Sequence, residues 1–294
     1  MIVLGLTATN GVDKELAEIL GVRHVAVEHK LFPDGESYIR IPISVEHEHI
    51  VIVQSTYKPQ DKHLLELLLA IEAVKDLGAQ TITVVAPYLA YARQDKRFRT
   101  GEAISIKTVL RSIRCAGADV LITVEIHKEH VLTYFTGTAV NVSAMDALAE
   151  YFKDKVVEPL VLAPDIGALP RAKRFAEIVG GDYDYLEKIR DRVTGEVRVK
   201  PKNISVKDRI VIIVDDIIST GKTMALAAEQ ALEHGAREVY AACAHALFVN
   251  DAYERLMKAG IREVVATNTV PVPRGVVSTS IAPYIARTIN ELYG

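Results

Sequence analysis

Short runs of apolar, mostly β-branched residues alternate along the chain with longer segments of helical periodicity, and this alternation restricts the possible folds most. Apolar runs with few charges are typical of parallel strands that are covered on both faces. The segments between them have one wide apolar face, as in residues 64–74 before the helix-ending Gly78. The sequence therefore predicts an α/β fold with mainly parallel sheets flanked by helices. The expected strands are residues 2–6, 50–53, 82–86, 120–124, 160–163, 210–214, 239–244 and 264–266.

The two halves of the sequence resemble each other, which indicates a duplicated domain. Any single match is explained by the general likeness of βα units, but three matches in the same order favour duplication. We expect a first domain over residues 1–143, a second over 144–280, and a last helix over 281–294 that packs on the first domain. The matching pairs are residues 49–53 with 209–213, 78–84 with 235–241, and 117–122 with 260–265.

Composition places the chain among globular proteins and excludes several functional classes. Its 294 residues are 49% hydrophobic and 25% charged, with a formal net charge of −3. This balance argues against a protein that coats nucleic acid or an anionic membrane, and no apolar stretch approaches the roughly 18 residues of a membrane span. Cys115 and Cys243 are too few for a disulfide framework or a zinc site, and we expect both to be buried thiols. We expect a cytoplasmic protein with no nucleic-acid or membrane partner.

Residues 211–223 carry the sharpest functional pattern: an apolar strand, two acids, a short polar loop with a glycine, and a helix. Ligands of open α/β sheets bind at the carboxyl ends of the strands, and the amino end of a helix attracts phosphate. Asp215 and Asp216 would repel a phosphate, so they suit sugar hydroxyls or a cation. The pattern predicts a site for a ribose 5-phosphate group, with the diol at the acids. The phosphate is expected at Ser219, Thr220, Gly221, Lys222 and Thr223.

Two other interpretations of this segment are weaker. Gly221-Lys222-Thr223 resembles the end of a Walker A loop, but Asp216 stands where that motif needs its first glycine, so we reject a P-loop protein. A plain strand end with solvated acids remains as the alternative, and the attached glycine loop and helix argue against it.

Residues 215–221, Asp-Asp-Ile-Ile-Ser-Thr-Gly, resemble the phosphoribosyl-binding loop of type I phosphoribosyltransferases. Segments from residue 2 to residue 290 resemble archaeal-type members of the ribose-phosphate pyrophosphokinase (phosphoribosyl pyrophosphate synthetase) family. The most specific is Pro-Tyr-Leu-Ala-Tyr-Ala-Arg-Gln-Asp at 87–95, which is similar to the family signature PYxxYARQD. The resemblance implies two type I phosphoribosyltransferase-like domains. It also implies the conversion of ATP and ribose 5-phosphate into AMP and phosphoribosyl pyrophosphate.

The loop of residues 32–36 resembles the family's adenine-side loop. A purine could stack on Phe32, and Asp34 and Glu36 could accept hydrogen bonds from its amino group. By itself the sequence favours an ordinary Pro-Asp-Gly turn with exposed acids. The resemblance reverses this preference and implies that Phe32, Asp34, Gly35 and Glu36 bind ATP.

The segment at 87–95 ends with Arg93 and Gln94, which the resemblance assigns to ATP. Arginine can grip phosphate oxygens with two parallel hydrogen bonds. The basic residues that follow, Lys96, Arg97 and Arg99, are by themselves more typical of a solvated surface. A triphosphate substrate would need such a basic loop, with Arg93 and Gln94 closest to the nucleotide.

The resemblance implies that His127 and Asp165, which follow expected strands, hold Mg²⁺. Asp165 offers the oxygen ligand that Mg²⁺ prefers, whereas a lone histidine or a turn aspartate in such a place is usually structural. The chain departs from the family pattern at Ala168, where a second glycine is typical. It also departs at Lys222, where a small residue is common.

Residues 185–199 read as a charged hairpin with a Thr194-Gly195 turn. Its strand alternation places Lys188, Arg190 and Arg192 on one face. Without the resemblance, an exposed charged ribbon is the better interpretation. The resemblance implies a mobile catalytic loop with Lys188 as the catalytic lysine and Arg190 as its partner, also in contact with ribose 5-phosphate.

Two rival functions share parts of this pattern. An ordinary phosphoribosyltransferase would need the acid loop but not the duplicated domain or the 32–36 loop. A non-catalytic regulatory homologue would have lost Lys188, Arg190, His127 and Asp165, all of which are present. The resemblance also implies a homo-oligomer, a dimer or larger, with the active site near a subunit interface.

Overall fold

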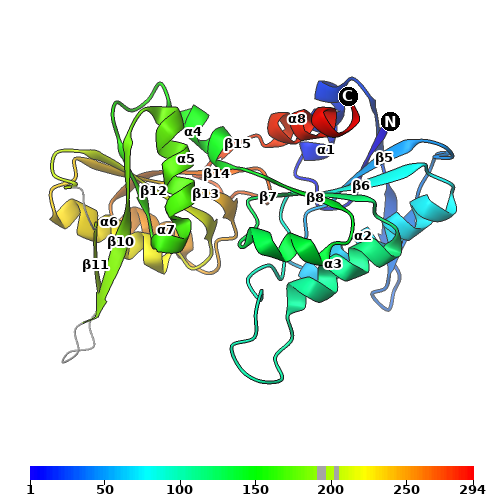
Figure 1. The fold of residues 1–294 in the computed structure, drawn as a ribbon, viewed down its shortest axis with the longest axis horizontal. Coiled ribbons are helices and arrows are strands. Elements are labelled where there is room, and N and C mark those ends of the chain that lie inside the picture. Colours follow the sequence, from blue (N-terminus) through cyan, green and yellow to red (C-terminus); the bar gives the residue numbers. More distant parts are fainter. Residues whose placement is uncertain (191–196, 202–204) are drawn as a thin grey trace. The chain divides into compact units, whose positions relative to one another are not determined.

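The structure is a computed structural model that describes residues 1–190, 197–201 and 205–294. It divides the chain into two compact units (Figure 1). Unit 1 comprises Met1–Val142 and Ile281–Gly294, and unit 2 comprises Ser143–Ser280. None of the helices in the described residues is both long enough and apolar enough to cross a membrane.

Unit 1 contains a parallel sheet with the strand order β2-β1-β5-β6-β7-β8 and a separate antiparallel hairpin, β3–β4. In Figure 1, α1 and α8 lie together on one face of the sheet, and α2 and α3 lie on the other. The C-terminal helix α8 thus packs on α1, close to the start of the chain. The strands are β1 (Ile2–Gly5), β2 (Arg23–Ala26), β3 (Glu28–Leu31), β4 (Ser37–Arg40), β5 (His49–Val53), β6 (Thr81–Ala86), β7 (Val120–Val124) and β8 (Thr138–Val142). The helices are α1 (Val12–Leu20), α2 (Gln60–Asp76), α3 (Ser105–Ala116), the 3₁₀ turn η1 (Glu129–Tyr134) and α8 (Ala282–Tyr293).

Unit 2 repeats this strand order as β10-β9-β12-β13-β14-β15, and β11 is added beside β10. All neighbours are parallel except the pair β10 and β11, which extends away from the sheet (Figure 1). The helices α4 and α5 pack together, with Phe152 and Phe175 fully buried between them, and α6 packs against α7. The strands are β9 (Leu160–Ala163), β10 (Asp182–Arg190), β11 (Val197–Pro201), β12 (Ile210–Ile218), β13 (Glu238–Ala246), β14 (Ile261–Thr267) and β15 (Val277–Thr279). The helices are α4 (Met145–Phe152), the 3₁₀ turn η2 (Ile166–Ala168), α5 (Leu169–Val179), α6 (Lys222–Glu233) and α7 (Ala252–Lys258).

The predicted fold class is confirmed, because both units have mainly parallel sheets flanked by helices. The predicted strands are present, and the central ones, such as β7 and β9, are buried along their whole length. The repeated segments of the sequence lie on corresponding strands: β5 and β12, β6 and β13, and β7 and β14. This correspondence supports a duplication of one domain.

The expectation of two buried thiols is wrong for one cysteine. Cys243 is buried in β13, but Cys115 is exposed on α3. The buried face of α3 is formed by Ile106, Val109, Leu110 and Ile113. Since Cys115 lies two residues beyond Ile113, the helical period of 3.6 residues places it on the opposite face.

Candidate active site

The two acids of unit 2 lie inside a strand rather than after it. β12 was expected to end at residue 214, but it continues to Ile218, where it still pairs with Ala246 of β13. Asp216 is buried and Asp215 is half-buried, and the backbone N–H of Asp216 donates to Asp215 Oδ1 at 2.9 Å. The strand thus holds two carboxyl groups side by side at the edge of the sheet where its parallel strands end.

The carboxyl groups of Asp215 and Asp216 are in electrostatic conflict. Burial, and then the negative charge of Asp216, raises the pKa of Asp215 to about 8, well above its usual range. A partial counter-charge comes from α5, where Arg171 Nη2 lies 3.7 Å from Asp216 Oδ2 and both side chains are largely buried. Hydroxyl donors or a cation would relieve this conflict, so the site is chemically suited to a sugar diol or a metal ion.

The loop after β12 leads directly into the amino end of α6. Gly221 is the residue before the helix, and its φ of +71° lies in the left-handed region that favours glycine. A Cβ at this position would lie 3.2 Å from the carbonyl oxygen of Ala252. The N–H groups of the first helical turn have no intrahelical partner by geometry, and they start at Lys222 and Thr223, whose side chains are exposed. The loop and helix therefore have the form of a phosphate cradle.

Neighbouring segments hold the backbone of this loop in place. The carbonyl oxygen of Ser219 accepts a hydrogen bond of 2.9 Å from the N–H of Val249. Arg255 of α7 donates from its guanidinium to the carbonyl oxygen of Thr220, and it also pairs with Asp251 at 2.9 Å. The cradle is thus shaped before any ligand binds.

The two residues expected to hold a metal ion belong to different units. Asp165 follows β9, a neighbour of β12, and its exposed carboxylate accepts the N–H of Gly167 at 2.8 Å. His127 is half-buried and lies beyond β7, which ends at Val124 as expected. Within the described ranges, no three His, Cys, Asp or Glu side chains gather in a way that could hold a metal ion. The donor set still fits Mg²⁺, since Asp165 offers a second carboxylate oxygen, the ligand type that Mg²⁺ prefers, and the neighbouring strand β12 carries the carboxyl groups of Asp215 and Asp216.

The expected charged hairpin is present as the strand pair β10 and β11. β10 pairs with β9 as far as Tyr185 and then with β11, so the backbone of Lys188 lies opposite Val199 and that of Arg190 opposite Val197. Arg192 and the predicted turn at residues 194–195 lie outside the described residues.

In unit 1, residues 32–36 form the loop of the β3–β4 hairpin. The N–H of Phe32 donates to the carbonyl oxygen of Glu36 at 2.8 Å, and Gly35 has a φ of +97°. Phe32 is 40% exposed, and its ring packs edge-on against Tyr38 at 5.9 Å between ring centres. Asp34 and Glu36 are exposed as well, so the loop presents an aromatic face and two carboxylates to solvent.

The hairpin loop borders an open hollow of about 640 Å³, and α2 forms its other side. Asp61 at the start of α2 lines this hollow and also accepts a hydrogen bond from the hydroxyl of Tyr91. α2 therefore connects the hairpin with the 87–95 segment, which contains Tyr91. The hollow is lined by Leu31, Asp34, Gly35, Glu36, Ser37, Asp61, Lys62, Leu65 and Leu69.

The 87–95 segment is anchored at its start and open at its end. Ser55 Oγ accepts the N–H of Tyr88 at 3.1 Å, and Thr56 Oγ1 accepts that of Ala90 at 2.7 Å. Arg93 is exposed, and the Gln94 amide donates to the carbonyl oxygen of Lys96. The backbone is thus fixed by hydroxyls at the end of β5, while Arg93 is accessible to a ligand.

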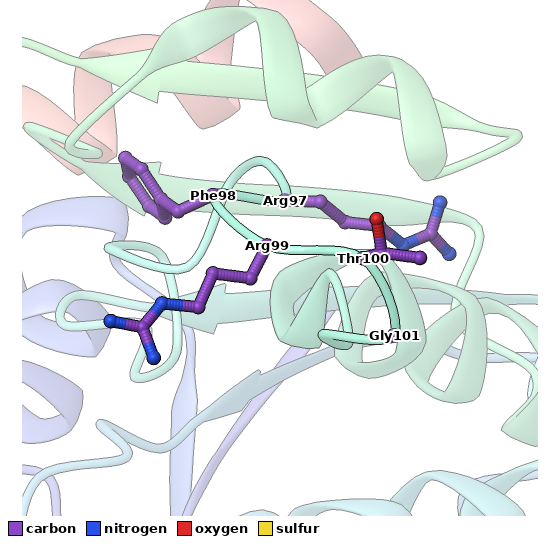
Figure 2. Close-up of a pocket in the computed structure, with 5 residues that line it drawn as sticks. All are labelled: Arg97, Phe98, Arg99, Thr100 and Gly101. Carbon is purple, nitrogen blue, oxygen red and sulfur yellow. The ribbon is translucent and has the colours of Figure 1, made fainter.

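The basic loop beyond this segment surrounds a second open hollow, of about 550 Å³, formed by residues 97–101 (Figure 2). The carboxylate of Glu102 accepts the N–H groups of Phe98 at 2.7 Å and Arg99 at 3.0 Å. Figure 2 shows that the guanidinium groups of Arg97 and Arg99 point in different directions. The loop therefore supplies accessible positive charge but does not focus it on one point.

Sequence analysis missed three residues that support these segments. Arg171 contacts Asp216, Arg255 holds the carbonyl of Thr220, and Glu102 shapes the basic loop. The arginines lie within ordinary helices and Glu102 just before α3, so no local motif distinguishes them. Their roles depend on contacts that only the folded chain brings about.

Taken together, the strand order and the acid–glycine–helix cradle of unit 2 define the class of phosphoribosyltransferase-type α/β proteins. A family model described as the N-terminal domain of ribose phosphate pyrophosphokinase matches residues 1–117, and a phosphoribosyl transferase domain model matches residues 131–276.

Full-length relatives carry the same description. The chain is 53% identical to the ribose-phosphate pyrophosphokinase of Sulfurisphaera tokodaii and 47% identical to that of Saccharolobus solfataricus, in each case over 98% of this chain and 100% of the relative. The crystal structure of phosphoribosylpyrophosphate synthetase from Mycobacterium smegmatis superposes with a TM-score of 0.88 at 31% identity, covering 99% of this chain and 98% of that one. The chain belongs to the ribose-phosphate pyrophosphokinase family.

Proposed function

We infer that this chain transfers the β,γ-diphosphoryl group of ATP to the 1-hydroxyl of ribose 5-phosphate, which gives AMP and phosphoribosyl pyrophosphate for nucleotide biosynthesis. The observation that carries this conclusion is the match over both units at 53% identity to a ribose-phosphate pyrophosphokinase. An ordinary phosphoribosyltransferase would account for unit 2 but not for the N-terminal match over residues 1–117.

Ribose 5-phosphate is assigned to unit 2. Asp215 and Asp216 would accept hydrogen bonds from the 2- and 3-hydroxyls, which also relieves their mutual repulsion. The 5-phosphate would be bound by the loop from Ser219 to Gly221, with the first N–H groups of α6 at Lys222 and Thr223.

ATP is assigned to the two surface segments of unit 1. The adenine ring would stack on the exposed face of Phe32, with its amino group near Asp34 and Glu36 and with Gly35 allowing the tight loop. Arg93 and Gln94 would contact the polyphosphate, and the adjoining basic loop would raise the local concentration of ATP.

The reaction is an in-line displacement at the β-phosphorus. The 1-hydroxyl oxygen of the sugar loses its proton to solvent and bonds to the β-phosphorus. The bond between the β-phosphorus and the oxygen that bridges it to the α-phosphorus breaks, and AMP leaves with that oxygen. The protein mainly positions the reactants and stabilises negative charge. Lys188 and Arg190, on the β10–β11 hairpin, would approach the transferring group and exclude water. Mg²⁺, held by His127 and Asp165, would neutralise phosphate charge.

The chain should also assemble as a homo-oligomer, a dimer or larger, with its active site near a subunit interface. Light scattering after size-exclusion chromatography would measure the assembly. If subunits share sites, co-refolded mixtures of the Lys188→Ala and Asp34→Ala chains should regain activity that neither chain has alone. A monomer with full activity would contradict this part of the proposal.

One assay tests the reaction against its rivals. Purified protein with Mg²⁺, ATP and ribose 5-phosphate should form AMP and phosphoribosyl pyrophosphate in equal amounts, measured by chromatography. Ribose without the 5-phosphate is the matched control, and it should not react because the cradle then has no ligand. The absence of AMP with both substrates present would reject the function and favour a regulatory homologue.

A further inference from the structure

Glu66 is a buried acid in α2 that no step of the reaction uses. Its side chain is only 1% exposed, although α2 is a surface helix. Four donors reach its carboxylate: the Thr7 hydroxyl, the Ser37 hydroxyl at 3.4 Å, the Gln54 amide at 3.3 Å and the Lys62 ammonium at 2.9 Å. A buried carboxylate with this many partners is a fixed point of the structure.

The carboxylate of Glu66 is charged at neutral pH. Burial raises the pKa of Glu66, but the hydrogen bonds from Thr7 and Lys62 and the positive charge of Lys62 outweigh burial, so its pKa lies below the usual value. A charged group in this place loses its full hydration, and it is stable only while its donors stay in position. The network is therefore rigid by necessity.

The donors come from segments that are far apart in sequence. Thr7 follows β1 and Gln54 follows β5, so these two lie at the carboxyl ends of neighbouring central strands. Gln54 is fully buried and ties the network further, since its Oε1 accepts the N–H of Ala8 at 2.8 Å. This side of the network is anchored in the core of unit 1.

The other side of the network reaches the β3–β4 hairpin. Ser37 is the first residue of β4 and directly follows the loop of residues 32–36. Ser37 and Lys62 both line the 640 Å³ hollow beside Asp34 and Glu36. Glu66 thus lies between the rigid ends of β1 and β5 and the stem of a hairpin whose loop is otherwise exposed.

We propose that Glu66 is a positioning residue for nucleotide binding: its carboxylate holds Ser37 and Lys62 and thereby sets the place of the 32–36 loop. This inference rests on the proposed assignment of adenine to that loop. Glu66 itself does not touch ATP, and it acts through the hairpin stem.

The test is the substitution Glu66→Gln. It keeps the side-chain volume but removes the negative charge that pairs with Lys62 and accepts the hydrogen bond from Thr7. The Kd and KM for ATP should rise about tenfold, as expected for the loss of one charge-assisted positioning contact. The KM for ribose 5-phosphate and kcat should stay within about twofold, since uniform loss of nucleotide binding leaves kcat unchanged. Thr83→Val is the matched control, because it removes a buried hydroxyl that hydrogen-bonds Tyr293 elsewhere in unit 1. It should lower Tm without changing the Kd for ATP.

Ser37→Ala provides a milder variant that remains informative if Glu66→Gln does not fold. It should raise the Kd for ATP about threefold. The double variant with Glu66→Gln and Ser37→Ala should bind ATP more tightly than the sum of the two single effects predicts, since both changes break the same hydrogen bond. An unchanged Kd for ATP in Ser37→Ala would overturn the inference. The inference would also be wrong if Glu66→Gln lowers Tm as the control variant does but leaves the Kd for ATP unchanged.

Asp34→Ala separates this inference from the assignment on which it rests. If Asp34→Ala weakens ATP binding while Glu66→Gln and Ser37→Ala do not, only the positioning role is wrong. If Asp34→Ala leaves the Kd for ATP unchanged, the adenine assignment fails, and the positioning role fails with it.

Discussion

The two units share one strand order but have different strands added at the same place in it. After the edge strand β2, unit 1 adds the β3–β4 hairpin with Phe32 and Asp34. At the corresponding place in unit 2, β10 itself extends beyond β9 and pairs with β11. Each unit thus has a hairpin beside its sheet, and we propose that the hairpin of unit 1 binds substrate whereas that of unit 2 takes part in catalysis.

The matched central strands differ in a second way. The alignment of residues 49–53 with 209–213 places Ser55 and Thr56 of unit 1 at the positions of Asp215 and Asp216 in unit 2. The two hydroxyls are buried and bind backbone groups of the 87–95 segment. The two acids repel each other at the same edge of the sheet. The comparison teaches that unit 1 uses this edge for internal hydrogen bonds, whereas unit 2 places two acids there at a cost in stability, as our proposal of a ligand site at these acids requires.

The largest expected effect is on kcat, and it tests whether the β10–β11 hairpin differs in role from the β3–β4 hairpin. Lys188→Ala should lower kcat by about 10²–10³-fold, because one charge-stabilising donor is lost from the transition state, and the Kd for ATP should not change. Steady-state kinetics and equilibrium ATP binding measure the two quantities. Lys207→Ala, which removes an exposed lysine of the same unit, is the control. A near-normal kcat for Lys188→Ala would mean that the β10–β11 hairpin is not the catalytic one.

The next effect concerns stability at the matched strand positions. Asp215→Asn should raise the Tm of the ligand-free protein because it removes the repulsion between the two acids, by about 2–4 °C for each kcal/mol of unfolding free energy gained. Ser55→Ala should lower the Tm, because the buried N–H of Tyr88 loses its acceptor. Asp215→Asn should also raise the KM for ribose 5-phosphate, since Asn has only one acceptor oxygen. If the Tm changes in the same direction in both variants, the proposed difference between the two strand ends is wrong.

The stabilisation by Asp215→Asn should grow with pH. The folded-state pKa of Asp215 is raised from 3.8 to about 8, so the folded protein holds this proton more tightly than the unfolded chain does. The contribution of this carboxyl to stability therefore falls as pH rises between these two values. Urea unfolding of both proteins at pH 5 and pH 8 should give a larger difference in unfolding free energy at pH 8. An equal difference at both values would show that the pKa of Asp215 is not raised.

Sequence patterns predicted the central strands because burial on both faces leaves a run of apolar residues that is easy to recognise. They missed β2, β8 and β15, which are short outer strands with mixed burial and no clear period, and also the hairpin strands β3 and β4, which have no buried residue. The end of β12 was placed too early because a pair of acids usually marks the end of a strand, and here the pair lies inside one. Strand limits at functional sites are thus set by tertiary contacts.

The residues of the candidate site also fall into those that a local sequence pattern reveals and those that only tertiary contacts reveal. Gly221 and the acids of β12 lie close together in sequence, and a local pattern was enough to find them. Glu66 and Arg171 could not be found in this way, because each acts on a segment that the fold brings near from elsewhere in the chain. Sequence patterns thus single out candidate binding residues more readily than the contacts that hold such residues in place.

A smaller effect concerns the glycine of the cradle. Gly221→Ala should cost about 1–2 kcal/mol, because alanine is strained at a φ of +71° and its Cβ would approach the carbonyl of Ala252. It should also raise the KM for ribose 5-phosphate by displacing the loop. Gly180→Ala is a matched control with the same φ and open space around the new Cβ. If both variants bind ribose 5-phosphate equally well, the close contact at Gly221 has no role in the site.

The smallest effect contrasts the amino ends of α2 and α6. α2 has Asp61 in its first turn, which favours the helix, whereas α6 begins with Lys222 and has no acid there. Lys222→Ala should therefore stabilise the ligand-free protein by about 0.3–1 kcal/mol, since a cation at a helix start is unfavourable. If the lysine contacts the 5-phosphate, the KM for ribose 5-phosphate should rise about threefold at low ionic strength, and this difference should shrink as salt is added. A KM that is unchanged at every salt concentration would mean that the N–H groups of α6 bind the phosphate without help from the Lys222 side chain.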